Sequence, residues 1–394
     1  MKSARLLISC GEPSGDLYAG ALVRELHAID PHIAVSGMGG PAFAAAGGTL
    51  LEDYRGVAVT GLTEAIRKIP KSWGALRRLA AWARANRPDA LVVIDFPDFN
   101  FRLARRLKAL GIPVVYYISP QIWAWRPKRI DAIRGFADLV LVIFPFEEAI
   151  YRAAGVPVEF VGHPLIDLAR PSAPRAAFLR LQGFSLSAPT IAILPGSRPN
   201  EVSRILPDLM VAAKKIRMRL PSAQFFVARA PNLDDDHFES LSAGGQTLFR
   251  VLEGDTDAIL AAANVVLTAS GTATVQTALH GTPMVIVYRV SPLTYRLLRR
   301  LVTVESIGMV NLIAGERIVP ELIQEAFTPA TVAGEAISML TDEERVNRIR
   351  AGLARVREKL GGPGASRRAA EAILNVVRRP GLIRPGAHND VGPT

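Results

Sequence analysis

Residues 6–16 read Leu6-Leu7-Ile8-Ser9-Cys10-Gly11-Glu12-Pro13-Ser14-Gly15-Asp16. A short, mostly apolar run is followed by a turn containing Gly and Pro, and a helical pattern starts near Leu17. A buried strand that passes through such a turn into a helix is the repeating unit of a doubly wound parallel sheet. Cys10 is the chain's single cysteine, and its position in the apolar run predicts a buried strand residue instead of a reactive thiol.

The same alternation of short apolar runs and amphipathic stretches continues along most of the chain. The predicted strands are residues 6–10, 33–36, 90–94, 114–118, 139–143 and 158–161, then 191–194, 225–228, 265–268 and 284–287. A stretch with Pro, Ala and Ser at 163–189 separates the two series. We therefore predict two Rossmann-like domains with doubly wound parallel sheets, at 1–165 and 166–345. Helices are expected at 346–379, and a disordered tail at 380–394.

The composition describes a packed globular protein. Of the 394 residues, 49% are apolar and 21% are charged, and this length is typical of two domains. The N-terminus enters the first strand without a signal-peptide core, which predicts a cytoplasmic protein. No apolar run approaches the roughly 20 residues of a membrane-spanning helix, so any membrane contact is expected to be peripheral.

The formal net charge of +11 favours an anionic partner. Nucleic acid, an acidic lipid surface and a phosphorylated substrate would each satisfy this requirement, and charge alone does not choose among them.

The turn at residues 11–16 is a candidate anion site. Backbone N–H groups at a helix N-terminus face an anion there, and glycines allow a ligand to approach the backbone. The candidate binding residues are Gly11, Glu12, Ser14, Gly15 and Asp16. The structural alternative is a capped turn in which Ser14 or Asp16 is the helix N-cap.

Two nucleotide fingerprints are not supported. The stretch GMGGPA at 37–42 fits a loose dinucleotide pattern, but no suitable acidic residue follows about 20 residues later, so NAD is not expected. The P-loop pattern is absent from the sequence. We expect no cofactor.

A carboxylate pair follows the predicted strand 90–94, in the sequence DFPDFN. The carboxyl ends of parallel strands are where open α/β sheets bind ligands. Asp98 is therefore a candidate general base, although it could instead cap the following helix. For Asp95 a turn-stabilising role is the preferred interpretation.

The second half contains two candidate sites for a diphosphate. LPGSR at 194–198 follows a strand, so Gly196, Ser197 and Arg198 could meet the phosphates, with a salt bridge from Arg198 to Glu201 as the structural alternative. TASGTAT at 268–274 exposes hydroxyls and amides at a predicted helix N-terminus, where Ser270, Gly271 and Thr272 could bind a phosphate or simply cap the helix. The two stretches together favour ligand binding.

Residues 65–88 contain no acid and carry seven basic residues among apolar ones. Such a basic amphipathic segment with Trp suits an anionic membrane surface, whereas a solvated helix face and RNA binding are the alternatives. The expected membrane contacts are Leu62, Ile66, Ile69, Trp73 and Leu76.

Two further groups have less specific signals. Asp234, Asp235, Asp236 and His237 resemble metal ligands but are expected to form a solvated turn, and no metal site is predicted. His163, in Gly-His-Pro, is a candidate donor contact, although lone histidines have many structural roles.

Several of these motifs occur together, in order, in the lipid-A-disaccharide synthase family, which this chain resembles. They are 11–16, 94–100, SPQIWAW at 119–125, 160–164, 194–198, 269–274 and 283–289. The resemblance spans nearly the whole chain, and the SPQIWAW run is its most specific part.

The resemblance implies a GT-B architecture, with two Rossmann-like domains facing a cleft and the C-terminal helices crossing back to the first domain. It implies an inverting transfer of 2,3-diacylglucosamine from UDP to 2,3-diacylglucosamine 1-phosphate, forming the β-1,6 lipid A disaccharide 1-phosphate and UDP without a metal. Asp98 would take the proton of the acceptor 6-hydroxyl, and Arg198 would stabilise the departing UDP.

Further expectations follow from the same resemblance. Asn311, in VNLIAG, would line the cleft. Gln276 replaces a Glu that the family commonly has, and it can still hydrogen-bond a ribose. We expect peripheral association with the anionic inner-membrane surface and no nucleic-acid partner, and we leave a homodimer open. The competing functions are another UDP-sugar transferase or a UDP-N-acetylglucosamine 2-epimerase, and, from a different class, an RNA-binding protein.

Overall fold

A computed structural model describes residues 3–57, 62–122, 128–230, 233, 238, 249–290 and 306–378, with the side chains of 62–69 left out. The chain divides into two compact units, one made of Met1–Pro164 with Gly361–Thr394 and the other of Leu165–Leu360. The expected boundary at 165/166 is one residue from this division, whereas the second unit extends 15 residues beyond the predicted end at 345. The expected tail at 380–394 lies outside the described residues.

The first unit is built on a seven-stranded parallel sheet in the order β3-β2-β1-β4-β5-β6-β7. Its strands are β1 (Arg5–Ser9), β2 (Ala34–Gly39), β3 (Thr49–Asp53), β4 (Ala90–Ile94), β5 (Val114–Tyr117), β6 (Leu139–Val142) and β7 (Val158–Phe160). Its helices are α1 (Pro13–Ile29), α2 (Pro41–Ala45), the 3-10 turn η1 (Tyr54–Gly56), α3 (Leu62–Asn86), α4 (Pro97–Lys108), α6 (Arg129–Phe136), α7 (Pro145–Ala153) and α18 (Ala365–Arg378).

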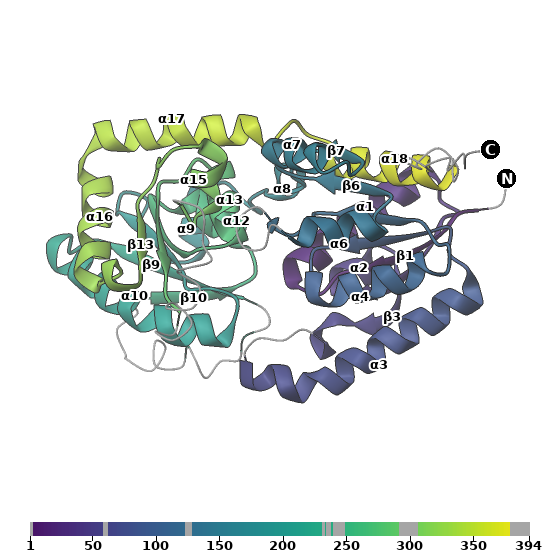
Figure 1. Ribbon diagram of the computed structural model, residues 1–394. Helices are drawn as coiled ribbons and strands as arrows, with labels where there is room; N and C mark the ends of the chain where they lie inside the picture. The colour runs from purple at the N-terminus through teal and green to yellow at the C-terminus, as the bar shows by residue number, and fades with distance from the viewer. Residues whose placement is uncertain are drawn as a thin grey trace, which may run out of the picture. The chain divides into compact units, whose positions relative to one another are not determined.

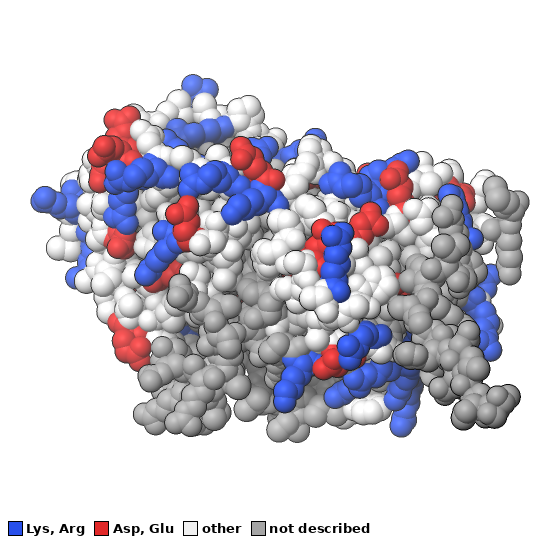
Figure 2. Space-filling view, turned by 45° about the horizontal axis from the view of Figure 1, so that its top comes forward, with Lys and Arg blue, Asp and Glu red and all other residues white. Residues whose placement is uncertain are grey.

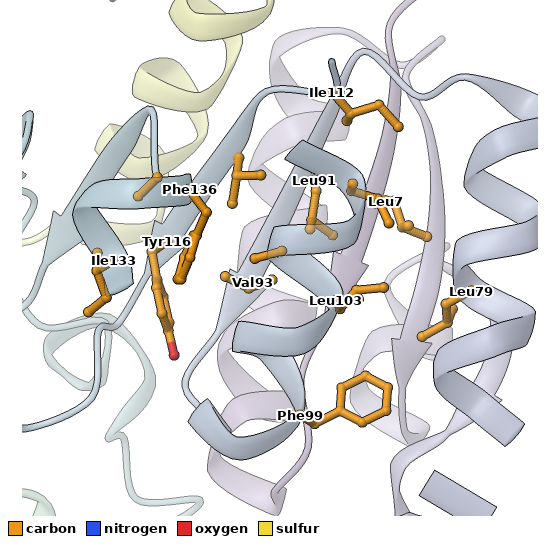
Figure 3. Close-up of a cluster of buried hydrophobic side chains, with 14 of the residues drawn as sticks. Leu7, Leu79, Leu91, Val93, Phe99, Leu103, Ile112, Tyr116, Ile133 and Phe136 are labelled. Atoms are coloured by element: carbon orange, nitrogen blue, oxygen red, sulfur yellow. The ribbon is translucent and has the colours of Figure 1, made fainter. Parts of the chain in front are cut away.

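The hydrophobic core of the first unit lies between its sheet and the helices α3, α4 and α6 (Figure 3). Leu7 and Leu91 come from neighbouring strands, and Leu79, Leu103 and Phe136 come from the three helices. These side chains are almost fully buried, and burial of each large apolar side chain contributes about 1.5 to 3 kcal/mol. This packing fixes where α3 and α4 lie relative to the carboxyl ends of β1 and β4.

The helix α18 belongs to the first unit although it follows the whole second unit in sequence (Figure 1). It packs against α1, and its buried residues include Ala369, Ala370, Ile373 and Leu374. The Arg368 guanidinium donates to the backbone carbonyl of Val161 at 2.9 Å. The preceding helix α17 (Glu343–Lys359) belongs to the second unit, so of the segment predicted at 346–379 only the last helix returns.

The second unit has a six-stranded parallel sheet in the order β10-β9-β8-β11-β12-β13. Its strands are β8 (Thr190–Leu194), β9 (Gln224–Arg229), β10 (Phe249–Glu253), β11 (Val265–Ala269), β12 (Met284–Tyr288) and β13 (Glu321–Ile323). Its other elements are α8 (Leu165–Leu168), α9 (Arg175–Leu181), α10 (Pro199–Arg219), α12 (Thr256–Ala262), α13 (Thr272–Leu279), α15 (Met309–Ala314), η3 (Gln324–Ala326) and α16 (Pro329–Thr341).

The two doubly wound parallel sheets confirm the predicted fold class, but three strands were missed. They are β3, β10 and β13, and each lies at an edge of its sheet. Edge strands are covered less completely, so they lack the continuous apolar run that marks a central parallel strand. The strand β3, for example, has no fully buried residue.

No helix among the described ranges is both long enough and apolar enough to cross a membrane.

Candidate active site

The first candidate site lies where the chain direction reverses in the first sheet. From β1 the chain continues toward β2, and from the adjacent β4 it continues toward β5, on the opposite side. The loops after these two strands therefore diverge, and such a point is where open α/β sheets bind ligands. A pocket of about 400 Å³ is found there, lined by Glu12, Val57, Ser72, Trp73, Asp95, Phe96, Pro97, Asp98, Phe99 and Arg102.

The turn between β4 and α4 has an unusual backbone. Asp95 and Phe96 both have left-handed conformations, with φ of 45° and 48°. For L-residues this costs roughly 1 to 2 kcal/mol each, and such strain is found at functional sites when the surroundings hold it. Directly after this turn, Asp98 lies in the first turn of α4 and lines the pocket.

The buried side chain of Asn100 fixes this turn by hydrogen bonds. Its buried amide donates to the carbonyl of Asp95 at 2.8 Å, and its oxygen accepts from the Ser9 hydroxyl at 2.7 Å. The Tyr116 hydroxyl donates to the same Asp95 carbonyl at 3.1 Å. The role of Asn100 was missed in the sequence, where an amide beside Phe99 on an otherwise apolar helix face was the available signal.

Asp98 is the predicted base, and its side chain is 83% exposed. Arg129 donates to it at 2.6 Å, and the Arg129 guanidinium lies 5.5 Å from the centre of the Phe101 ring. The N-cap of α4 is Phe96, so the alternative of Asp98 as a helix cap is wrong. An exposed ion pair of this kind contributes at most about 1 kcal/mol to stability, and the exposed carboxylate is open to solvent.

The predicted anion turn at 11–16 is shorter than expected, because α1 already begins at Pro13. Gly11 lies against the ring of Phe96, and a side chain at this position would overlap that ring. Glu12 lines the pocket, whereas Ser14 and Gly15 are in the first helical turn.

Asp16 is a structural residue, which corrects its prediction as a substrate contact. Its buried carboxylate accepts from the backbone N–H groups of Gly40, Ala42 and Phe43 at 2.7, 2.9 and 3.0 Å. These donors lie at the N-terminus of α2, where a carboxylate is favourable. The side chain therefore fixes the loop after β2.

His163 is also internal. It is 2% exposed and packs against the rings of Tyr18 and Phe144 at centroid distances of 6.0 and 5.5 Å. Burial lowers the pKa of His163 to about 3, because the charged imidazolium loses its hydration. His163 is therefore a buried, neutral imidazole, and its contact with the donor stays a prediction.

The second candidate site lies at the corresponding point of the other sheet, between β8 and β11. After β8, Gly196 has φ of 120°, and a side chain there would lie 2.8 Å from a carboxylate oxygen of Glu201. Arg198 donates to Glu201 at 3.2 Å, so the predicted structural alternative is present. The Arg198 side chain is nevertheless 46% exposed, and the neighbouring Ser197 is exposed as well.

After β11, the chain enters α13 through Ser270 and Gly271, which is the helix N-cap. Ser270 donates to the carbonyl of Ile307 at 3.3 Å, and Thr272 is exposed. Neither Ser270 nor Thr272 makes the side-chain cap of α13, because Gly271 occupies the N-cap position. Gln276, one turn further, donates to Asp257 at 2.8 Å, and His280 contacts the same carboxylate oxygen at 2.7 Å.

Tyr288 was not predicted as a site residue. It ends β12, and burial, with the nearby negative charge of Glu201, raises the pKa of its hydroxyl, while Arg198 opposes the rise. The tyrosine therefore borders the loop that carries Gly196 and Arg198. An aromatic residue with a polar end at the carboxyl end of a predicted strand was the signal in the sequence.

Asn311 is structural, which corrects its prediction. Its amide donates to the Val319 carbonyl at 2.9 Å and to Glu321 at 2.6 Å. Its oxygen accepts from the N–H groups of Ile318 and Val319 at 2.9 and 3.1 Å. All of its donors and acceptors are thus used inside the second unit.

The predicted membrane contacts divide into three groups. Leu76 is 2% exposed and belongs to the hydrophobic core, so its prediction as a membrane contact is wrong. Trp73 is 40% exposed. The side chains of Leu62, Ile66 and Ile69 lie outside the described part of the structure. Figure 2 shows that basic side chains predominate on the face it presents, in line with the net charge.

No group of three His, Cys, Asp or Glu side chains suited to a metal ion occurs within the ranges described. Residues 234–237 and 123–127 lie outside those ranges.

The family model described as lipid-A-disaccharide synthetase matches residues 6–376. The chain belongs to this family. A lipid-A-disaccharide synthase from Syntrophus aciditrophicus is 41% identical over 96% of this chain and 99% of its own length. One from Geobacter metallireducens is 43% identical over 95% of this chain and 97% of its own.

Solved structures show the fold. A UDP-GlcNAc 2-epimerase from Neisseria meningitidis bound to UDP-GlcNAc has a TM-score of 0.65 and 12% identity, covering 95% of this chain and 100% of that one. The glycotransferase of kitacinnamycin has a TM-score of 0.63 and 16% identity, covering 96% and 100%. The architecture is GT-B, and the family assignment makes the chain a glycosyltransferase that forms the lipid A disaccharide from a UDP-sugar and a lipid acceptor.

Proposed function

We propose that this lipid-A-disaccharide synthase family member transfers 2,3-diacylglucosamine from UDP to 2,3-diacylglucosamine 1-phosphate, with inversion at the anomeric carbon. The observation that supports this proposal is the exposed carboxylate of Asp98, held by a strained turn in a pocket at the reversal point of the first sheet. The products are the β-1,6 disaccharide 1-phosphate and UDP.

In the proposed step, Asp98 accepts the proton of the acceptor 6-hydroxyl while that oxygen bonds to the anomeric carbon of the donor. The bond from this carbon to the diphosphate oxygen breaks, and its electron pair leaves with UDP. A positioned base of this kind contributes roughly 10² to 10⁴ in rate. Arg129, 2.6 Å from Asp98, positions the carboxylate.

The second unit would bind UDP. The exposed Ser197 and Arg198 follow β8, and Ser270, Gly271 and Thr272 precede α13 on the adjacent strand. We propose that Arg198 exchanges Glu201 for the diphosphate when UDP is bound, which would stabilise the leaving group. Gln276, held by Asp257, would approach the nucleotide through its remaining amide groups.

We further propose that α3 contacts the anionic inner-membrane surface, where both acylated substrates reside. Its exposed basic residues include Arg77 and Arg84, seven positions apart and therefore on one face of the helix. Each basic residue near such a surface contributes about 1 kcal/mol of attraction.

The test is disaccharide formation in mixed micelles by wild type and by Asp98→Asn, which keeps the shape but cannot accept the proton. We expect a loss of about 10² to 10⁴ in kcat, with UDP affinity unchanged. Asp131→Asn is the matched control, because this exposed carboxylate also pairs with an arginine, Arg134, and is expected to keep full activity. Equal activity of wild type and Asp98→Asn would remove Asp98 as the base, and a folded wild type without product would contradict the proposed reaction.

A further inference from the structure

Two guanidinium groups meet on one aromatic ring in the first unit. The Arg102 and Arg106 guanidinium carbons lie 5.5 and 5.4 Å from the centre of the Trp73 ring. Trp73 is 40% exposed, so this cluster of three side chains faces solvent. Arg102 and Arg106 are four positions apart on α4, where side chains are neighbours on one helix face.

The fold does not explain this arrangement. Neither arginine forms a salt bridge within the described residues, whereas Lys108 on the same helix pairs with Asp138 at 2.5 Å. Like charges at this spacing repel each other, and one aromatic ring does not neutralise two cations. A ligand carrying two negative charges would turn the repulsion into attraction, as two arginines often do around a phosphate.

The cluster is continuous with the candidate active site. Arg102 and Trp73 line the same pocket as Asp98. Asp98 and Arg102 are also four positions apart on α4, so their backbones are about 6 Å apart along the helix axis. That separation is on the scale of one hexose ring. A sugar whose hydroxyl meets Asp98 can therefore reach Arg102 with a group on its opposite side.

The pocket also restricts where an anion can lie. Glu12 and Asp95, in the loops after β1 and β4, and Asp98, in the first turn of α4, bring three carboxylates to the pocket, and Arg129 pairs with the last of them. An anionic group is repelled from Glu12 and Asp95 and is favoured beside Arg102 and Trp73, at the other side of the pocket. The charge distribution thus orients a ligand that has a neutral hydroxyl at one end and an anion at the other.

We propose that Arg102, with Arg106 and the Trp73 ring, forms the subsite for the phosphomonoester of the acceptor. This inference rests on the proposed function, since that reaction uses an acceptor with a 6-hydroxyl and a 1-phosphate. Arg102 binds the phosphate and so directs the opposite end of the sugar toward Asp98. The residue therefore determines which acceptor is used, without taking part in proton transfer.

The experiment compares Arg102→Gln with Arg105→Gln, an exposed arginine of the same helix that does not line the pocket. Two acceptors are used in neutral detergent micelles, namely 2,3-diacylglucosamine 1-phosphate and the methyl glycoside that lacks the phosphate. Initial rates are measured at saturating donor, and binding of each lipid is measured separately by calorimetry.

For Arg102→Gln we expect KM and Kd for the phosphorylated acceptor to rise about 10- to 100-fold, the loss typical of a charge-assisted contact. The values for the methyl glycoside stay within a factor of about two, and Arg105→Gln changes neither acceptor. An equal loss on both acceptors, or no loss, would overturn the subsite.

A third arm adds an anionic phospholipid to the micelles. If Arg102→Gln raises KM and Kd only in these anionic micelles, and equally for both acceptors, the ligand is a lipid headgroup and the proposal is wrong. Because binding is measured without turnover, failure of the subsite can be told apart from failure of the proposed reaction. A wild type that binds the phosphorylated lipid through Arg102 yet forms no disaccharide would remove the proposed function and keep the subsite.

Discussion

Buried polar residues hold the loops of the candidate active site in place through hydrogen bonds within the protein. Asn100 donates a hydrogen bond to the carbonyl of Asp95 in the strained turn, and Asp16 accepts hydrogen bonds from three backbone amides after β2. Each satisfied buried group avoids a cost of about 1 to 3 kcal/mol. The polar residues of these motifs thus form two groups: some line the pocket, and others hold its loops in place by buried hydrogen bonds.

His163 allows a prediction at the scale of a single residue. Its pKa is about 3 in the folded protein and near 6.5 when unfolded, so the unfolded chain binds more protons between these values. The stability of the first unit should therefore fall as pH is lowered through this range, by about 2 kcal/mol between pH 8 and pH 5 from this residue alone.

The measurement is urea unfolding of the first unit at pH 8 and pH 5. His163→Gln should lose about 2 kcal/mol of the pH dependence shown by wild type, whereas His32→Gln, at an exposed position, should keep it. An unchanged pH dependence in His163→Gln would show that the pKa of His163 is the same in the folded and unfolded states.

At the scale of elements, α3 combines two tasks. Its inner face supplies Ala75, Leu76, Leu79 and Ala83 to the core, and its outer face carries exposed arginines. A helix with a packed inner face presents its charges in a fixed orientation, which favours adsorption to a surface over wrapping around a flexible partner.

Replacing two of these charges should weaken membrane binding. For Arg77→Gln with Arg84→Gln we expect a loss of about 2 kcal/mol, or roughly 30-fold, in affinity for vesicles containing anionic lipid. Co-sedimentation with vesicles measures this, and neutral vesicles should show no difference. The control is Lys214→Gln with Lys215→Gln, an exposed pair on α10. Equal losses for both double variants would mean that net charge, and not α3, determines binding.

The sequence predicted elements best where burial is complete. The central strands β1, β4, β8 and β11 were found because they are almost fully buried and therefore consist of apolar runs, and both reversal points follow from them. Side-chain roles were harder. Asp16 and Asn311 lie in motifs that suggest ligands, but their partners come from segments that only the folded chain brings together. Arg102 was missed because its relation to Trp73 is a contact between two helices.

At the scale of the whole molecule, the two units differ in continuity. The second unit is one stretch, Leu165–Leu360, with a complete six-stranded sheet. The first requires α18, which covers α1 with side chains such as Ile373 and Leu374. Losing burial of several such side chains removes about 1.5 to 3 kcal/mol each, a large share of the 5 to 15 kcal/mol that stabilises a typical domain.

We therefore expect a fragment of residues 165–360 to unfold cooperatively in urea, and a fragment of residues 1–164 to show no cooperative transition. Joining 361–394 to 1–164 through a flexible linker should restore the transition. Near-ultraviolet circular dichroism of the three fragments measures the outcome. A cooperative transition in 1–164 alone would show that α18 is dispensable for the first unit.

The late position of α18 in the chain also has a consequence for biosynthesis. The ribosome completes the seven strands of the first sheet long before it makes the helix that covers α1, because all of Leu165–Leu360 comes between them. At about 5 to 20 residues per second, the delay is on the order of 10 to 40 seconds. During that interval the nascent first domain exposes an apolar face, and it is then that a chaperone would have its substrate.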